Sequence, residues 1–252
     1  GLTATDLADD AFTNTTTAPV NVIYTVVPVS AAGCQGNPFT ITVTIDPEPV
    51  VANQTQTVCS DVPLTGFTLG NDLDGPNVAS YNITGINLNG LAVSAGTPTT
   101  GTGFLANALA DDAFTNTTNA DVDVIYTIVP VGVNGCLGDP FTVTATIKPE
   151  PVVANQVKPV CSDEPLGISF NPSTSVPAAT YNITAINQNG LVASAGNPTT
   201  GTGLAANVIA DDAFTNNTSA AVDVVYDVVP VSADGCLGNP FTLTVTVNPE
   251  PV

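Results

Sequence analysis

The amino-acid sequence repeats itself with a period of about one hundred residues, and this periodicity constrains the fold more than any other feature. The heptapeptide Ala-Asp-Asp-Ala-Phe-Thr-Asn stands at 8–14, 110–116 and 210–216, so its copies are offset by 102 and then by 100 residues. A fixed period of this length is typical of arrays of similar structural units. The chain is therefore expected to fold as tandem domains.

A second repeated motif marks the boundaries between these units. The tetrapeptide Pro-Glu-Pro-Val stands at 47–50, 149–152 and 249–252. Proline removes a backbone donor and favours extended neighbours, so each copy is expected to be a short, semi-rigid linker. This predicts the C-terminal half of a repeat over residues 1–50 and complete repeats over 51–152 and 153–252. The chain lacks Met and opens in the middle of a repeat, so we expect both ends to be cuts in a longer polypeptide.

Hydrophobicity within each unit has a period of two, which indicates β-strands. Apolar residues alternate with Thr at 39–45, 141–147 and 241–247. A β-branched segment precedes each of these at 22–29, 124–131 and 224–231, and the turn between the two segments ends in Gly33, Gly135 or Gly235. Each pair of segments is predicted to form a β-hairpin.

The rest of each unit also reads as short strands separated by turns. We expect strands at 52–58, 64–69, 79–88, 91–95 and 105–110 with their equivalents, and a second hairpin turn at Asn89-Gly90 and Asn189-Gly190. No segment has a helical pattern. About seven strands in about one hundred residues predict an all-β fold, in which each repeat is an antiparallel Greek-key β-sandwich.

Charge and composition exclude several classes of function. Lys148 and Lys158 are the only basic residues, against 22 acidic ones, and the net charge of −20 repels nucleic acid and anionic lipid. No run of 18 apolar residues is present, so no membrane insertion is expected. The chain has no His for a Ser-His dyad or a metal site. We therefore expect a protein that is not an enzyme.

Five cysteines stand at repeat-equivalent positions and predict disulfides. Two pairings fit: Cys59 with Cys136 and Cys161 with Cys236 within units, or Cys34 with Cys59 and Cys136 with Cys161 across linkers. We favour the first, because each pair then lies inside one folding unit. That choice leaves only Cys34 unpaired, since its partner would belong to the missing half of its own repeat. Disulfides imply an oxidising compartment.

Calcium is the one cofactor that the sequence suggests, because hard cations bind carboxylate and carbonyl oxygens. Two groups of aspartates are candidates for a weak site: Asp72 and Asp74 in an Asp-x-Asp-Gly stretch, and the repeated pairs Asp111 with Asp112 and Asp211 with Asp212. The alternative is that the paired aspartates lie at a solvated turn or strand end. Adjacent residues of a strand point to opposite faces, so the pairs do not suit general acid and base catalysis.

Several motifs together carry a family resemblance along essentially the whole chain. The order is Asp-Asp-Ala-Phe-Thr-Asn, Val-Ile-Tyr, Gly-Cys-x-Gly-x-Pro-Phe-Thr and Asn-Pro-Glu-Pro-Val. It resembles the PKD-like, immunoglobulin-like repeats of giant surface adhesins of gliding Gram-negative bacteria. The resemblance implies type IX secretion, a cell-surface location and extracellular scaffolding. It implies as partners the neighbouring repeats, a surface anchor or motility machinery, and glycans or other cells.

Two functions fit these observations. The leading hypothesis is a non-catalytic stalk or fibre segment of a large extracellular adhesin or surface filament. The alternative is a carbohydrate- or protein-binding module accessory to a secreted multidomain protein. Carbohydrate binding usually uses exposed aromatics, and this chain has no Trp and only 6% aromatic residues. Tyr24, Tyr126 and Tyr226 recur within the strand before each final hairpin and are expected to anchor the sandwich through the phenol.

Overall fold

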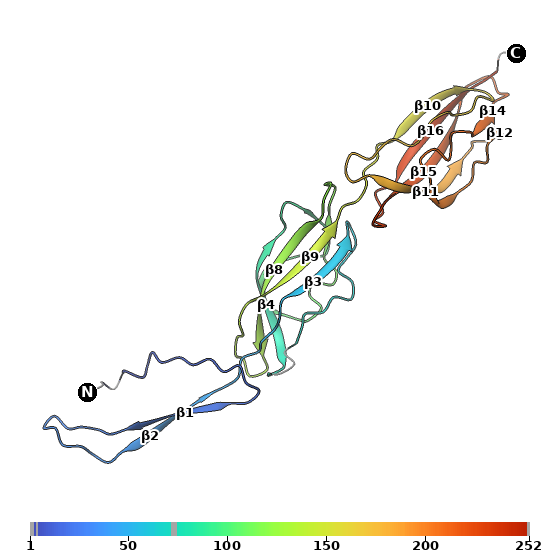
Figure 1. The fold of residues 1–252 in the computed structure, drawn as a ribbon. Helices are drawn as coiled ribbons and strands as arrows, with labels where there is room; N and C mark the ends of the chain where they lie inside the picture. Colours follow the sequence, from blue (N-terminus) through green and yellow to red (C-terminus); the bar gives the residue numbers. More distant parts are fainter. Residues whose placement is uncertain (1–2, 4, 72–74, 251–252) are drawn as a thin grey trace.

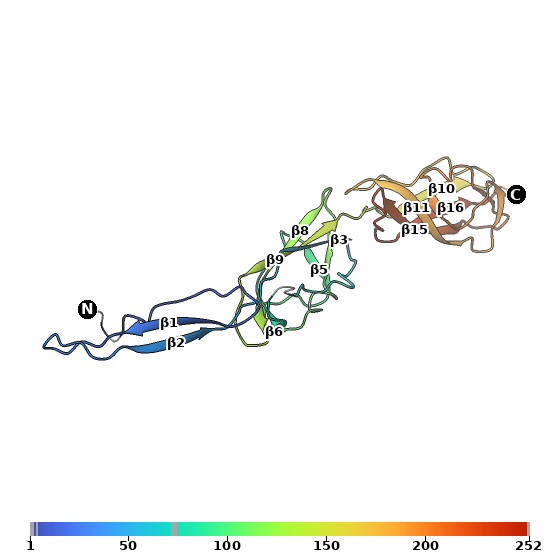
Figure 2. The ribbon, with the colours of Figure 1, turned by 60° about the horizontal axis from the view of Figure 1, so that its bottom comes forward.

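The computed structural model describes residue 3, residues 5–71 and residues 75–250. Its three units follow one another along a rod, with the N-terminal hairpin at one tip and the second complete repeat at the other (Figure 1). A second view shows the same elongated arrangement (Figure 2). Strands without helices make up the regular structure of the described residues, which confirms the predicted all-β class.

The first complete repeat is a sandwich of one large and one small sheet. The large sheet has the order β3-β9-β8-β4-β6, and the small sheet pairs β5 with β7. The strands are β3 (Gln54–Cys59), β4 (Val78–Asn87), β5 (Ala92–Ala95), β6 (Gly101–Phe104), β7 (Ala113–Thr115), β8 (Val122–Gly132) and β9 (Phe141–Lys148). All pairs are antiparallel except β3 with β9, which run parallel along their whole length.

The second complete repeat has the same topology. Its large sheet has the order β10-β16-β15-β11-β13, and β12 pairs with β14. The strands are β10 (Gln156–Cys161), β11 (Ala178–Asn187), β12 (Val192–Ala195), β13 (Gly201–Leu204), β14 (Ala213–Thr215), β15 (Val222–Ser232) and β16 (Phe241–Asn248). Again the edge pair, β10 with β16, is parallel.

The alternation predicted from the sequence decides which side chains enter the core. In β9 every second residue from Phe141 to Ile147 is buried, and the intervening Thr side chains are only partly buried. Strand β16 repeats this pattern. Because successive side chains of a strand point to opposite faces, one face of each long strand packs against the small sheet and the loops that cover it.

Within the described part of residues 1–50, the strands are the counterparts of β8 and β9. These form one antiparallel hairpin of β1 (Val20–Val26) and β2 (Phe39–Ile45). Phe39 is 49% exposed, whereas the equivalent Phe141 is 3% exposed. The difference arises because the strands that cover Phe141 in a complete repeat have no counterpart in this segment.

Three expectations about local structure are wrong. Residues 64–69 and 105–110 form turns and irregular loops, although Leu64, Phe67 and Leu69 are buried. The Asn89-Gly90 turn exists, with φ of 47° and 89°, but it does not close a hairpin. After this turn the chain crosses to the other layer, where β5 pairs with β7.

Candidate functional site: the junction between the complete repeats

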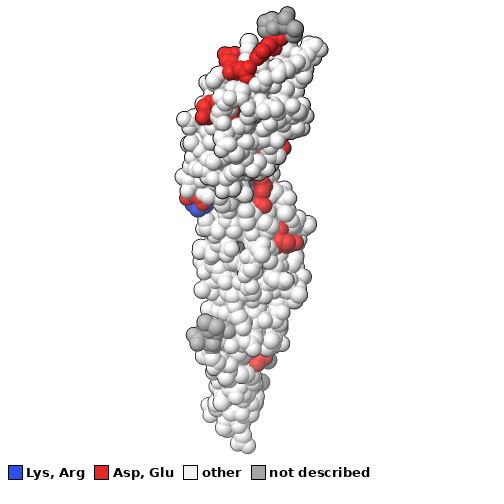
Figure 3. All heavy atoms as spheres, turned by 90° about the vertical axis from the view of Figure 1, so that its right-hand side faces the viewer, with Lys and Arg blue, Asp and Glu red and all other residues white. Residues whose placement is uncertain are grey.

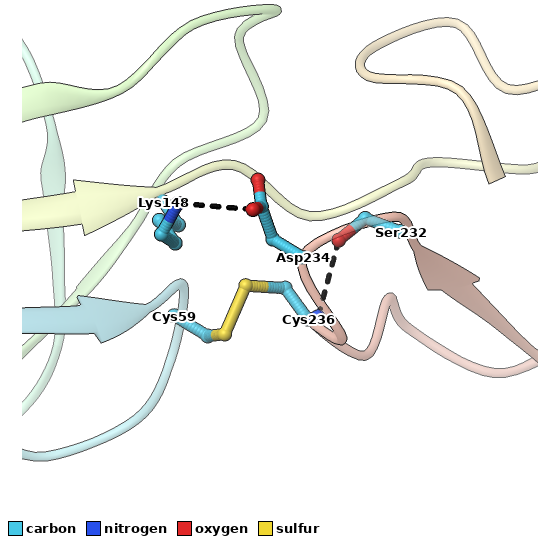
Figure 4. Close-up of polar contacts among 5 residues, drawn as sticks. All are labelled: Cys59, Lys148, Ser232, Asp234 and Cys236. Carbon is cyan, nitrogen blue, oxygen red and sulfur yellow. Dashed lines mark hydrogen bonds and ion pairs between the residues drawn. A yellow bond between two sulfur atoms is a disulfide. The ribbon is translucent and has the colours of Figure 1, made fainter. Parts of the chain in front are cut away.

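Strand direction determines which residues lie at each end of a repeat. Strands β3 and β9 run parallel, so Cys59 lies opposite Lys148 at the end of the sandwich where the chain leaves for the next repeat. The β15–β16 loop comes directly before β16, and β16 runs away from the first complete repeat. This loop therefore lies at the end of the second complete repeat that faces the first one. The end of β3 therefore meets the β15–β16 loop of the following repeat, as Figure 4 shows.

A disulfide crosses this junction. Cys59 at the end of β3 is bonded to Cys236 in the β15–β16 loop, with an S–S distance of 2.05 Å and a Cα–Cα distance of 5.3 Å. The two residues are 177 positions apart in the sequence. The bond joins two repeats that are otherwise connected only through the linker and surface contacts, so it restricts their relative movement.

The disulfide pairing predicted from the sequence is therefore wrong in the structure. Cys59 and Cys136 lie at opposite ends of one sandwich, because Cys136 precedes β9 whereas Cys59 lies beside its last residue. A strand of eight residues separates these ends by about 25 Å, and a disulfide needs Cα atoms within about 7 Å. The same geometry separates Cys161 from Cys236 in the next repeat.

The second pairing that the sequence allowed is absent too. Cys34, Cys136 and Cys161 are free thiols, and Cys34 and Cys161 are exposed. Cys34 lies in the β1–β2 loop, at the tip of the N-terminal hairpin that points away from the first complete repeat (Figure 1). Cys59 lies beyond the whole length of that repeat, so these two cysteines cannot meet.

An ion pair lies beside the disulfide. The Lys148 Nζ atom is 3.1 Å from Asp234 Oδ1, and the two side chains are 30% and 54% exposed. An ion pair this accessible contributes at most about 1 kcal/mol. Figure 3 shows one basic group beside an acidic one at the narrowing of the rod, on a face that otherwise carries only scattered acidic groups. The pair aligns the two repeats more than it stabilises them.

The linker is fixed by hydrogen bonds to the second complete repeat. The Val152 amide donates to the hydroxyls of Ser173 and Ser175, each at 2.9 Å. The Ser175 hydroxyl also donates to the carbonyl of Glu150 at 2.6 Å, and the Thr174 amide donates to the carbonyl of Val152 at 2.8 Å. These bonds hold the Pro-Glu-Pro-Val segment at 149–152 against the second complete repeat, so this linker is not a free tether.

A glycine in each hairpin loop lets the linker approach closely. A Cβ atom at Gly238 would collide with the carbonyl oxygen of Pro151. Gly138 has the same relation to Pro49 at the preceding junction. Both linkers therefore lie in the same way against the loop of the repeat that follows them.

Glu150 is an acidic residue of this junction that the sequence analysis did not single out. It is 2% exposed, and Asn239 donates to its carboxylate at 3.3 Å. Burial, the charge of Asp61 and a hydrogen bond with Asp61 together raise the pKa of Glu150 to about 7, and burial contributes most. The Pro-Glu-Pro motif marked the position, but the burial depends on the neighbouring repeat and could not be read from the sequence.

Comparison with known proteins agrees with this architecture. A model of the PKD-like domain family matches residues 1–49, 56–151 and 158–251. The chain belongs to the PKD-like domain family. No curated protein matches.

Solved structures similar to this PKD-like chain share little sequence with it. Mouse clustered PcdhgC3 EC1-3 is 14% identical, with a TM-score of 0.29 over 94% of this chain and 78% of that one. Human Protocadherin-24 EC1-2 is 16% identical, with a TM-score of 0.31 over 82% of this chain and 100% of that one. The fibronectin(III)-like modules of Clostridium thermocellum CbhA are 12% identical, with a TM-score of 0.25 over 79% and 91%.

The aspartate pairs of the PKD-like repeats have two different environments. Asp111 is exposed, but Asp112 is 2% exposed and accepts a hydrogen bond from the Tyr126 hydroxyl at 2.7 Å. Burial raises the pKa of Asp112, while the bond from Tyr126 lowers it. The expectation of a solvated turn is wrong for Asp112. Asp212 and Tyr226 form the same buried pair in the next repeat.

The described carboxylates of these pairs do not lie close to further acidic groups. Neither Asp111 with Asp112 nor Asp211 with Asp212 meets a third acidic group, and the described residues contain no cluster of three or more potential metal ligands. Asp72 and Asp74 lie outside the described residues. Weak calcium binding stays a prediction.

The tyrosines anchor the sandwich as predicted. The rings of Tyr126 and Tyr226 are fully buried, and each hydroxyl reaches an aspartate of the segment before the small-sheet strand. Tyr24 makes the same bond to Asp10 at 2.7 Å, but that pair is exposed because the first unit is incomplete. Within the described residues, no helix is long and apolar enough to cross a membrane.

Proposed function

We propose that this chain is a load-bearing segment of an extracellular stalk, in which PKD-like sandwiches are stacked end to end. The observation that carries the proposal is the disulfide between Cys59 and Cys236, because it joins successive repeats instead of reinforcing one of them. Disulfides persist in oxidising compartments outside the cytoplasm. Tandem PKD-like repeats fit a structural or adhesive extracellular module.

The junction makes the segment a stiff rod. The disulfide, the hydrogen-bonded linker and the Lys148–Asp234 ion pair restrain the same pair of repeats from different sides. Interfaces between domains of one chain usually allow relative motion unless they are large and apolar. Here a covalent bond between the repeats takes the place of the large apolar surface that stiffness would otherwise need.

The biological setting is part of the proposal. We infer that the stalk belongs to a large non-catalytic surface adhesin of the gliding-motility type, exported by type IX secretion and held by a surface anchor or the motility machinery. Glycans or other cells would then be bound by a different part of the adhesin. The division into units at 50/51 and 152/153 also stays a prediction, which limited proteolysis of the folded chain would test.

The decisive experiment locates the segment on cells and measures its parent. Antibodies raised against residues 51–252 would be applied to intact cells for immuno-electron microscopy, and the native antigen would be purified for mass measurement. We expect gold label along filaments outside the cell and a mass of many repeats. Label confined to the cell interior, or a parent protein of two or three compact domains, would refute the stalk proposal.

A further inference from the structure

Asparagine is followed by glycine at three places in this chain, Asn89-Gly90, Asn134-Gly135 and Asn189-Gly190. Asparagine is a thermolabile residue, and the residue after it decides how easily its side chain is attacked. Glycine has no Cβ atom to shield its own backbone nitrogen, so this nitrogen can reach the Cγ atom of the preceding asparagine. The structure places the three pairs in two different environments.

The first and third pairs lie in the turns that follow β4 and β11. Asn89 and Asn189 are exposed and have φ of 47° and 48°. A Cβ atom at Gly90 or Gly190 would meet nothing within 4 Å, so open space surrounds both glycines. Neither glycine amide donates to a backbone carbonyl of the described residues. The attacking nitrogen is therefore accessible and is not tied to the backbone of the turn.

One hydrogen bond holds the side-chain amide of each of these asparagines. The Asn89 Nδ2 atom donates to the carbonyl of Asp123 at 2.7 Å, and the Asn189 Nδ2 atom donates to the carbonyl of Asp223 at 2.8 Å. Both bonds are exposed, so water competes for the same donor and acceptor. Breaking this single bond frees the side chain to turn towards the glycine nitrogen.

Asn134 is held more firmly, although it precedes a glycine in the same way. Its Nδ2 atom donates to the carbonyl of Pro47 in the preceding linker at 2.7 Å, and its Oδ1 atom accepts the Cys136 amide at 3.2 Å. The amide of Gly135 donates to the carbonyl of Gly132 at 2.8 Å. Attack on Asn134 therefore requires three hydrogen bonds to break, whereas attack on Asn89 requires one.

We infer that Asn89 and Asn189 are sites of spontaneous deamidation in the folded protein, and that its contacts protect Asn134. The two modified positions are equivalent in the two complete repeats, so each repeat carries one such site. The inference does not depend on the stalk proposal, because the reaction requires only the folded chain and water.

The reaction has two steps and needs no oxidant. The Gly90 amide loses its proton to hydroxide, and its nitrogen attacks the Cγ atom of Asn89. The side-chain nitrogen leaves as ammonia, and a five-membered succinimide ring remains. Water then opens the ring at one of its two carbonyls and gives either aspartate or isoaspartate. Each site consumes one water molecule and releases one molecule of ammonia.

Both products change the turn through which the chain crosses between the two layers. An aspartate in place of Asn89 loses the Nδ2 donor and presents a negative charge to the Asp123 carbonyl. Isoaspartate also lengthens the backbone by one carbon atom, in a turn that the Leu91 amide closes on the Leu88 carbonyl at 3.0 Å. Leu91 is a core residue, only 8% exposed. Isoaspartate is therefore expected to disturb the core more than aspartate does.

The test is ageing of the purified chain at mildly alkaline pH, beside a matched sample unfolded in urea. Incubation continues until half of the Asn-Gly pairs in urea are modified. Peptic peptides, prepared at acidic pH where deamidation is slow, are quantified by mass spectrometry. Isoaspartate is counted with isoaspartyl methyltransferase and labelled S-adenosylmethionine.

The fold is expected to separate the three sites. In the folded protein Asn89 and Asn189 should react at similar rates, and at least about tenfold faster than Asn134, because two additional hydrogen bonds must break there. In urea the three sites should react at similar rates, since each has the same Asn-Gly pair and none has its folded contacts.

Variants provide the matched controls. Asn89→Ser combined with Asn189→Ser should remove most of the methylation of the aged folded protein. Asn89→Asp supplies the aspartate product without isoaspartate, so its melting temperature separates the effect of charge from that of the longer backbone. Modification of Asn134 as fast as of Asn89, or unmodified Asn89 and Asn189 in the folded protein beside a modified urea sample, would overturn the inference.

Discussion

Pulling on the two ends of residues 51–252 should reveal the inter-repeat disulfide directly. Tension that enters before Cys59 passes through the bond to Cys236 and leaves along β16, so residues between the two cysteines bear none of it. The 177-residue separation corresponds to about 600 Å of extended chain at about 3.3–3.6 Å per residue. While the bond holds, its ends stay within the Cα–Cα distance of 5.3 Å.

Single-molecule force spectroscopy with and without a reducing agent measures this hidden length. We expect the oxidised segment to extend by far less than its 200 or so residues allow, and a reductant to release one further step of about 600 Å. The intradomain pairing would instead hide two separate loops of about 260 Å each, from Cys59 to Cys136 and from Cys161 to Cys236. Cys161→Ser is the control, because it removes a thiol that bears no load. Two separate steps, or equal lengths with and without reductant, would refute the connectivity.

Four further outcomes are expected. Cys59→Ser should lower the melting temperature of both repeats, because closing a loop of about 90 unfolded residues against a folded neighbour is worth about 4–5 kcal/mol. Calorimetry checks this, and a lower melting temperature in one repeat alone would contradict it. Tyr126→Phe should cost about 1–3 kcal/mol in denaturant unfolding, since Asp112 loses its buried donor, and an unchanged midpoint would count against that role. Glu150 has a folded pKa near 7, above its ordinary 4.5, so its contribution to stability is complete below pH 4.5 and is lost as pH rises through 7. The melting temperatures at pH 5 and pH 8 should therefore differ less in Glu150→Gln than in the unchanged protein. An equal difference in both proteins would exclude this cause. Thermal unfolding with and without a chelator tests calcium binding. If calcium binds, the chelator should lower the melting midpoint.

The sequence predicted the strands best where apolar residues alternate with Thr without a break. Residues 39–45 match strand β2 at both ends, and β9 extends the predicted 141–147 by one residue. Prediction failed at 64–69, where Leu64, Phe67 and Leu69 are buried without regular alternation. There the Phe67 amide bonds back to the Leu64 carbonyl at 2.9 Å, which makes a turn. Apolar residues alone could not distinguish a buried loop from a short strand.

The disulfide was predicted wrongly because spacing does not show which end of a sandwich a residue occupies. The recurrence of the cysteines does reflect equivalent positions, since Cys59 and Cys161 each end the first strand of a repeat. Their positions became clear only from the parallel pairing of β3 with β9, which places Cys59 beside the last residue of β9. A uniformly antiparallel sheet was expected, and one parallel edge pair moves Cys59 away from Cys136 in its own repeat and towards Cys236 in the next one.

The same bond explains why stiffness should depend on the compartment. Apart from the disulfide, the junction contains an accessible ion pair and hydrogen bonds to the linker, and such contacts allow bending between domains. In a reducing cytoplasm Cys59 and Cys236 stay as thiols, so the repeats form a flexible chain of separate sandwiches. In an oxidising compartment, the Cys59–Cys236 bond links the two complete repeats and restrains the bending between them. On the proposed extracellular location, the stiff form would therefore assemble only after export.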